Sequence, residues 1–212
     1  MSPRPVLFVL AGVNGAGKSS IGGHLLEKSG LTWFNPDTFA REWIAATGCE
    51  QSAANAVAWQ EGMRRFDEAI SKNQNFAFET TLGGRTVVNK ILDATRQYDV
   101  MVWFCGLASP ELHIARVKTR VAAGGHDIPE AKIRERYPRA LENLLRLMPH
   151  LAHLQVYDNS VEAPISGAVP DPKLLLEMKR GRLTRPAPTD LKALKQTPDW
   201  AKPLLEAALP EH

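Results

Sequence analysis

The chain has 212 residues, 44% of them hydrophobic, and this length suits one domain with a tail better than two independent domains. Its 26 basic and 23 acidic residues leave a net charge of +3, an excess too small to require nucleic acid as a partner. The two cysteines, Cys49 and Cys105, are too few for a disulfide framework and lack the spacing of a zinc site. No apolar run approaches the roughly 20 residues of a membrane span, and a signal peptide has no room before the first glycine-rich loop. We therefore expect a cytoplasmic protein with no membrane partner.

Short apolar runs alternate with helical patterns along most of the chain. The first run, Val6 to Ala11, ends in a glycine and is typical of a strand buried on both faces of a parallel sheet. Similar strand signals recur at 32–35, 76–79, 100–107 and 154–157. Helical patterns occupy 19–28, 37–47, 53–72, 86–96, 110–123 and 129–147. The alternation predicts a three-layer α/β domain with a mostly parallel sheet of five strands.

The C-terminal part has a different composition. Proline becomes frequent from Pro164 onward and the hydrophobic periodicity thins. We therefore predict a domain over residues 1–163 and a Pro-rich extension over 164–212, which lies over the surface or partly unfolds. Within it, 173–179 and 191–194 are candidates for short helices.

Gly12 to Ser19 has the spacing G-x-x-x-x-G-K-[ST] between a predicted strand and a predicted helix, which is the context this motif requires. Its glycines allow the backbone N–H groups to point inward, and the helix N-terminus adds the positive end of its dipole. We expect the loop to bind the phosphates of ATP or GTP, with Lys18 on the β- and γ-phosphates and the Ser19 hydroxyl on Mg²⁺. A glycine-rich turn without a ligand is the alternative. The predicted nucleotide-binding residues here are Gly12, Asn14, Gly15, Ala16, Gly17, Lys18, Ser19 and Ser20.

Two carboxylates end the next predicted strands, at the sheet edge where α/β proteins bind ligands. Asp37 follows the second strand, and we predict that it accepts the proton of an acceptor hydroxyl; the alternative is an N-cap of the following helix. Glu79 ends the third strand and is predicted to bind the substrate together with Thr81; the alternatives are that it holds the metal through water or is only solvated. Arg85 follows two glycines in a loop that suits an anionic acceptor.

Five arginines lie on two predicted helices, which are separated by a hinge at Gly124 and Gly125: Arg116, Arg120, Arg134, Arg136 and Arg139. A helix, hinge and helix of this kind, over about residues 116–139, resembles a lid that closes over a triphosphate and excludes water. A guanidinium can bind two phosphate oxygens together. We predict catalytic roles for Arg120 and Arg136, nucleotide binding for Arg116 and substrate binding for Arg139, although most single arginines on a helix are solvated.

Other candidate residues lie outside these motifs. Asn159 follows the last predicted strand, where it could meet a purine ring or form a turn. Trp43, Trp59 and Trp103 are predicted to pack in the core or on the sheet rather than to serve as ligand platforms.

Four segments in this order resemble the zeta toxin family of P-loop kinases, which is near the UDP-N-acetylglucosamine kinases and chloramphenicol phosphotransferases. They are GVNGAGKSS at 12–20, NPD at 35–37, FETT at 78–81, and the stretch from Arg116 through GGHDIP to Arg136-Tyr137. The resemblance implies a P-loop kinase that uses ATP or GTP with Mg²⁺, a catalytic Asp37, an acceptor-binding Glu79 and lid arginines at Arg120 and Arg136. It further implies a UDP-amino sugar as the acceptor and admits an antitoxin protein as a partner.

Other functions fit the same motifs. A nucleoside or antibiotic kinase could be built on this scaffold. A nucleotide-dependent switch or NTPase that acts with nucleic acid or protein belongs to a different class. A binder of single-stranded nucleic acid usually presents aromatic platforms, whereas only 7% of these residues are aromatic. The composition therefore favours a small-molecule kinase.

Overall fold

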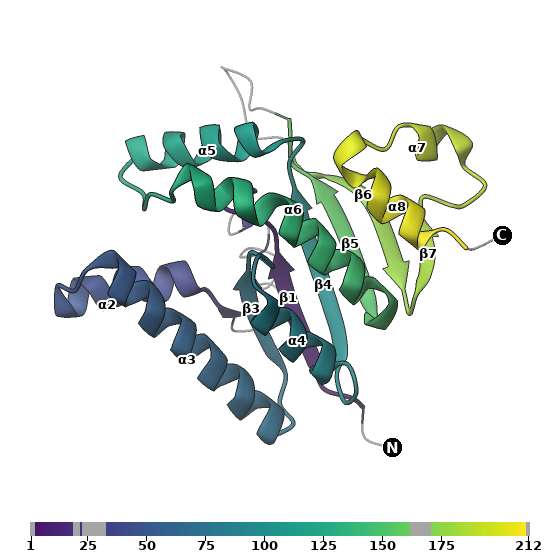
Figure 1. The fold of residues 1–212 in the computed structure, drawn as a ribbon. Helices are drawn as coiled ribbons and strands as arrows, with labels where there is room; N and C mark the ends of the chain where they lie inside the picture. The colour runs from purple at the N-terminus through teal and green to yellow at the C-terminus, as the bar shows by residue number, and fades with distance from the viewer. Residues whose placement is uncertain (1–2, 19–21, 23–32, 162–170, 211–212) are drawn as a thin grey trace.

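A seven-stranded sheet forms the centre of the computed structural model, which describes residues 3–18, 22, 33–161 and 171–210 (Figure 1). The strand order is β2-β3-β1-β4-β5-β6-β7. Its first five strands are parallel and lie where the sequence predicted them: β1 Val6–Ala11, β2 Trp33–Phe34, β3 Phe76–Thr80, β4 Asp99–Gly106 and β5 His153–Asp158. The α/β class and the mostly parallel sheet are therefore confirmed.

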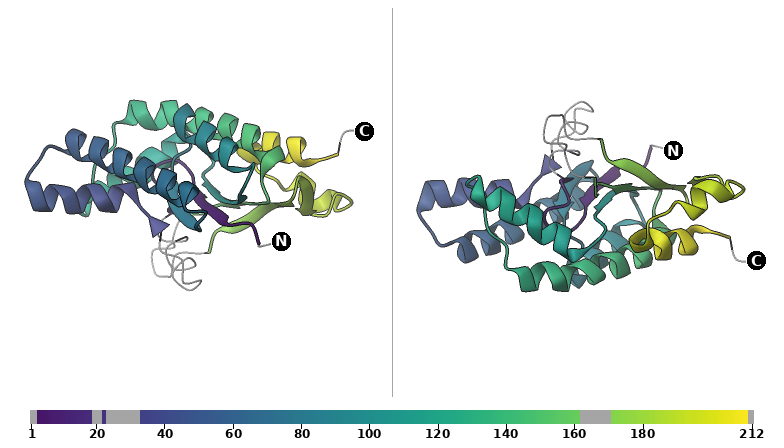
Figure 2. Two further views of the ribbon diagram at one scale, coloured as in Figure 1. Left: turned by 90° about the horizontal axis from the view of Figure 1, so that it is seen from below. Right: turned by 90° about the horizontal axis from the view of Figure 1, so that it is seen from above.

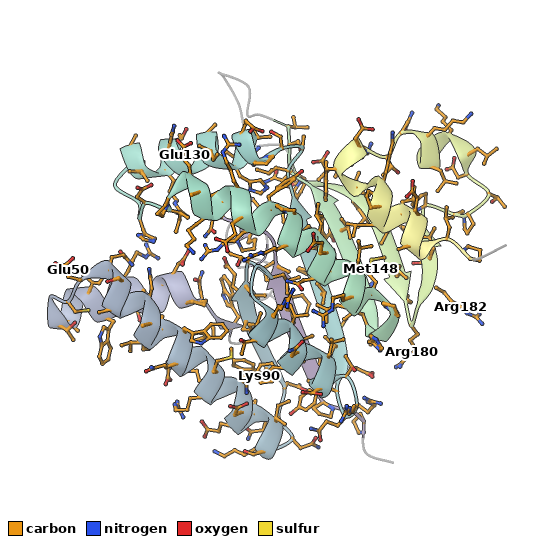
Figure 3. The ribbon with its side chains drawn as sticks, in the orientation of Figure 1. Glu50, Lys90, Glu130, Met148, Arg180 and Arg182 are labelled. Carbon is orange, nitrogen blue, oxygen red and sulfur yellow. The ribbon has the colours of Figure 1, made fainter. Side chains whose placement is uncertain are left out.

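The prediction of five strands is wrong, because two further strands extend the sheet beyond β5. The segment predicted as a helix is strand β6, Lys173–Lys179, which pairs antiparallel with β5 and then with β7, Arg182–Arg185. Arg180 and Gly181 both have positive φ, of 47° and 75°, as a two-residue hairpin turn requires. The seven residues KLLLEMK do not by themselves distinguish a helix from a strand, and their hydrogen bonds to β5 and β7 fix the strand. Figure 3 shows the Arg180 and Arg182 side chains at the tip of the hairpin.

Helices connect the parallel strands. Their bounds are α2 Pro36–Thr47, α3 Gln51–Ser71, α4 Arg85–Ala94, α5 Pro110–Ala122 and α6 Glu130–Leu147. A 3₁₀ turn at Met148–His150 leads into β5. After the hairpin come α7 Leu191–Lys195, a 3₁₀ turn at Asp199–Ala201 and α8 Lys202–Ala208. Apart from residue 22, the predicted helix 19–28 falls outside the described residues, and so does the layer that it would form on the other face of the sheet.

The main core lies between the sheet and helices α4, α6 and α8, which cover the same face (Figure 2). Leu7 and Val9 of β1 are fully buried in it, as expected for a central parallel strand. Trp200, beside α8, is 7% exposed and packs on Gly106, where an added Cβ would stand 2.3 Å from the indole. The C-terminal segment is thus part of the core rather than a loose surface extension. No helix among the described residues is long and apolar enough to cross a membrane.

Helices α2 and α3 form an arm that extends beyond the sheet next to β2 (Figure 1). Ala40, Ala54 and Ala58 make a small core between the two helices. Lys90 of α4, labelled in Figure 3, donates a hydrogen bond to Asp67 of α3 and lies 5.6 Å from the centre of the Phe66 ring. The arm is therefore attached to the body of the domain at its base.

Candidate active site

The loop between β1 and residue 18 has glycines at positions whose backbone conformation other residues rarely adopt. Gly12 and Gly15 have φ values of 142° and 84°. A Cβ at Gly12 would stand 2.2 Å from the Cys105 carbonyl oxygen, and one at Gly15 would stand 2.7 Å from the His113 carbonyl oxygen. Both glycines are needed for the loop to lie this close to its neighbours.

Buried polar groups hold the loop from behind. Asn159 Nδ2 and the Cys105 thiol both donate to the Ala16 carbonyl oxygen, at 2.9 and 3.0 Å. Burial raises the pKa of Cys105 to about 12, so the thiol keeps its proton for this contact. Asn159 thus supports the loop, and its contact with a nucleobase stays a prediction.

His113 of α5 is a further support and is 1% exposed. Its Nδ1 donates to the Asn14 carbonyl oxygen at 2.9 Å. Burial lowers the pKa of His113 from 6.5 to about 4, because a charged imidazolium would lose its hydration. In the unfolded chain the ring titrates near its ordinary pKa of about 6.5.

We expect this histidine to make the protein acid-sensitive. The unfolded state binds the proton more readily than the folded state does. The stability that the neutral His113 ring contributes is therefore fully present above pH 6.5 and is lost as the pH falls towards 4. The free energy of unfolding should fall by roughly 3 kcal/mol over that interval. Urea titrations at several pH values should show this slope, and His113→Gln should remove it. The control His150→Gln changes an exposed ring and should leave the slope as it is.

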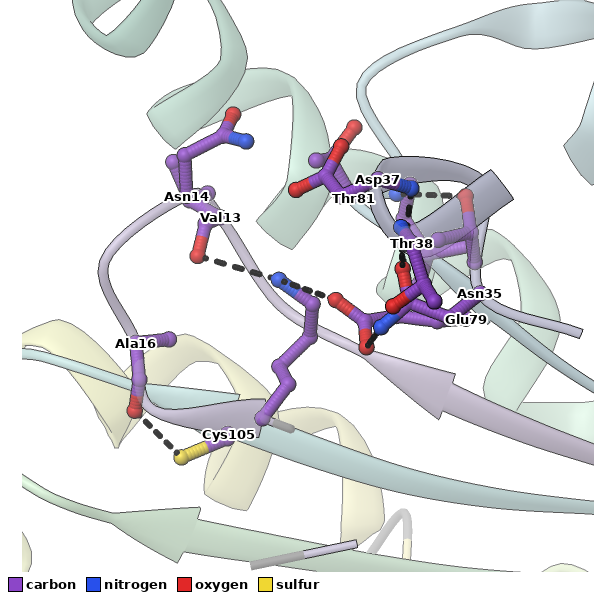
Figure 4. Close-up of polar contacts among 12 residues, drawn as sticks. Val13, Asn14, Ala16, Asn35, Asp37, Thr38, Glu79, Thr81 and Cys105 are labelled. Atoms are coloured by element: carbon purple, nitrogen blue, oxygen red, sulfur yellow. Dashed lines mark hydrogen bonds and ion pairs between the residues drawn. The ribbon is translucent and has the colours of Figure 1, made fainter. Parts of the chain in front are cut away.

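Lys18 and Glu79 form a buried ion pair, with 3.3 Å between Nζ and Oε1 and side-chain exposures of 6% and 8% (Figure 4). Lys18 Nζ also donates to the Val13 carbonyl oxygen at 3.4 Å. Asn35 Nδ2 donates to Glu79 Oε2 at 3.2 Å. Glu79 therefore joins the phosphate loop to the start of α2 and is not merely solvated.

Asp37 stands in the first turn of α2, but it does not cap the helix. The cap is Asn35, whose Oδ1 accepts from the backbone N–H groups of Asp37 and Thr38 at 2.9 and 3.2 Å (Figure 4). Pro36 occupies the first helical position, where its missing N–H costs nothing. The alternative reading of Asp37 as an N-cap is therefore wrong, and its carboxylate is available for another role.

Two cavities meet at these residues. The larger, of about 420 Å³, lies between the α2–α3 arm and α6, and its walls include Trp59, Thr81 and Arg136. The smaller, of about 200 Å³, lies over the loop and is lined by Gly15, Gly17, Arg116 and Arg120. Four residues line both cavities: Asn14, Lys18, Asp37 and Glu79. We call the smaller the donor cavity and the larger the acceptor cavity, after the roles that the sequence predicts for the residues that line them.

The structure brings three of the five arginines to the cavities. Arg116 and Arg120 reach the donor cavity, where Arg120 Nη2 also donates to the His126 carbonyl oxygen at 2.8 Å. Arg136 reaches the acceptor cavity and donates from Nη1 to Asn14 Oδ1 at 2.7 Å. Arg134 and Arg139 instead form ion pairs with glutamates on the exposed surface. Closure of α5 and α6 as a lid stays a prediction.

Other predicted site residues lie elsewhere. Arg85 is exposed at the start of α4 and, like Arg139, lines neither cavity. Ser19 and Ser20, and with them the predicted Mg²⁺ ligand, fall outside the described residues.

Sequence reasoning missed three residues at the site: Asn35, His113 and Trp59. The Asn-Pro pair at 35–36 is a known helix-start signal and could have shown the cap. Nothing in the sequence singles out His113. Trp59 is not a core residue as predicted, since it is 44% exposed and lines the acceptor cavity; Trp43 is also exposed, at 39%. Trp103 does pack on the sheet, with its ring centre 4.7 Å from that of Phe8.

Comparisons with known proteins point to one family. A family model described as zeta toxin matches residues 1–165. An uncharacterized protein of Haemophilus influenzae is 29% identical over 133 residues, which are 59% of this chain and 88% of that protein. AvrRxo1-ORF1, solved in complex with AvrRxo1-ORF2 and with ATP, has a TM-score of 0.64 at 13% identity and covers 100% of this chain and 65% of its own. A structure from the PezAT toxin–antitoxin system of Streptococcus pneumoniae has a TM-score of 0.56 at 18% identity and covers 74% and 68%. The two structures share the fold of this chain.

Proposed function

Because the chain belongs to the zeta toxin family of P-loop phosphotransferases, we propose that it transfers the γ-phosphoryl group of ATP or GTP to a hydroxyl of a UDP-amino sugar. The observation that carries the proposal is the meeting of two cavities at Asn14, Lys18, Asp37 and Glu79. An enzyme that transfers a phosphoryl group needs the donor phosphate and the acceptor hydroxyl in line and in contact. Molecules bound in the two cavities would meet at this junction.

The donor cavity suits the triphosphate. Lys18, Arg116 and Arg120 supply positive charge beside a loop of backbone N–H groups. The relative solved with ATP supports a nucleotide as the donor. PezAT and the AvrRxo1 complex each include a second protein, which supports an antitoxin-like partner for this chain as well.

The acceptor cavity suits an amphipathic molecule with a planar ring and anionic groups. Phe34, Trp59 and Phe78 give apolar and aromatic surface, and Lys132 and Arg136 give two cations. At the junction, Asp37 would accept the proton of the acceptor hydroxyl. The hydroxyl oxygen then bonds to the γ-phosphorus, and the bond to the bridging oxygen breaks as the nucleoside diphosphate leaves with its electron pair.

The donor set at the junction fits Mg²⁺, which prefers oxygen ligands and retains several waters. The described residues contain no cluster of three carboxylate, histidine or cysteine groups, so this ion would be held mainly by phosphate oxygens, water and the Ser19 hydroxyl. When bound, the ion would neutralise negative charge on the phosphates.

An acceptor screen with γ-labelled ATP tests the proposal. We expect label to enter UDP-N-acetylglucosamine or another UDP-sugar at a rate well above hydrolysis. Transfer to a nucleoside or to chloramphenicol instead would identify the alternative kinase. Label found only in inorganic phosphate, whatever the acceptor, would indicate a nucleotide-dependent switch and would overturn the proposed reaction.

A further inference from the structure

Gly83, in the loop between β3 and α4, lies directly against the side chain of Arg136. A Cβ added at Gly83 would stand 2.7 Å from Arg136 Cγ and 3.3 Å from Arg136 Cβ. Two carbon atoms attract best at about 3.5 to 4.0 Å, so a methyl group does not fit beside this arginine in its present position. The neighbouring Gly84 is different, because a Cβ there would meet no atom within 4 Å.

The loop around Gly83 is held in place. Thr81 Oγ1 accepts from the Gly83 N–H at 3.3 Å, and Thr80 Oγ1 accepts from the Leu82 N–H at 3.1 Å. Asn143 Nδ2 of α6 donates to the Leu82 carbonyl oxygen at 2.6 Å, and the Leu82 side chain is fully buried. Retreat of the loop would break these bonds, so a larger residue at Gly83 must displace Arg136 instead.

The atoms in conflict are the ones nearest the Arg136 backbone. Removing the clash therefore requires rotation about the first side-chain bonds of Arg136, and such a rotation moves its whole guanidinium group to a new position. At present that guanidinium bonds Asn14 Oδ1 at 2.7 Å. Asn14 is 6% exposed, and the hydrogen bond from His113 to its carbonyl oxygen holds its backbone in place.

We propose that Gly83 is a positioning residue, whose lack of a side chain lets Arg136 of the acceptor cavity reach Asn14, which lines both cavities. This inference rests on the proposed function only in the second of two tests. The matched control is Gly84→Ala, since Gly84 has an extended φ of −114° that alanine adopts readily.

The first test needs no nucleotide. A double-mutant cycle with Asn14→Ala and Arg136→Ala should give a coupling of about tenfold in the unfolding equilibrium constant, as expected for a hydrogen bond to a charged group. We expect that coupling to disappear in a Gly83→Ala background and to persist in a Gly84→Ala background. An equal coupling in both backgrounds would overturn the inference.

The second test measures hydrolysis of ATP in the presence of magnesium, with water as the acceptor. Gly83→Ala should lower kcat about tenfold and change KM for ATP by less than about twofold. Arg136 lines the acceptor cavity and not the donor cavity, so with water as the acceptor its cation beside Asn14 should act on the transferring phosphoryl group more than on bound ATP. Adding Gly83→Ala to Arg136→Ala should cause no further loss. A multiplicative loss would show that Gly83 acts by another route. If the first test succeeds and none of the proteins turns over ATP, either with water or with a UDP-sugar as the acceptor, the proposed function fails and the positioning role stands.

Discussion

An Asp37→Asn variant should bind ATP as well as the unaltered protein does and should transfer phosphate about 10²- to 10⁴-fold more slowly. The asparagine has nearly the same shape but does not accept a proton from the acceptor hydroxyl. The fold of α2 should persist, because Asn35 caps the helix and Pro36 begins it. The measurement is kcat for γ-phosphoryl transfer to the best acceptor, together with Kd for ATP with magnesium.

Glu42→Gln is the matched control for Asp37→Asn. It removes one carboxylate charge from the same helix at an exposed position outside both cavities. We expect its kcat to stay within about twofold of that of the unaltered protein, since solvent and salt largely screen an exposed charge outside the cavities. If Asp37→Asn behaves like Glu42→Gln, Asp37 is not the general base.

The sequence was most informative where local pattern and tertiary environment agree. Val6 to Ala11 is apolar throughout because β1 is buried on both faces, and the glycines that follow are required by the loop backbone. Such a strand and loop can be read from a single chain. The same holds for Asp37, since a polar residue at the carboxyl end of a parallel strand faces the ligand edge.

The sequence was least informative where a contact joins distant segments. The bond between Arg136 and Asn14 spans 122 positions and depends on how α6 crosses the sheet. Arginines at 134, 136 and 139 look alike in the sequence, and only their angle around the helix sends Arg136 to the loop and the others to surface glutamates. Strand β6 was mistaken for a helix for a related reason, because its partner β5 supplies the hydrogen bonds that decide its conformation.

A Lys18→Met variant should lose about 10²- to 10³-fold in phosphoryl transfer, because it removes a preorganised positive charge from the donor cavity. It should also be less stable by about 3 kcal/mol, since the substitution takes away the lysine charge that stands 3.3 Å from buried Glu79. A loss of activity in this variant therefore has two explanations, because loss of the fold and loss of phosphate binding would both abolish transfer.

The double variant Lys18→Met with Glu79→Gln separates the two effects of Lys18. Glutamine removes the buried negative charge and keeps an oxygen that can accept from Asn35, so most of the lost stability should return in a urea titration. Transfer should remain low, because no cation replaces Lys18 beside the phosphates. A double variant that regains both stability and transfer would show that Lys18 serves only to neutralise Glu79, and that the donor cavity binds its phosphates with Arg116 and Arg120 alone.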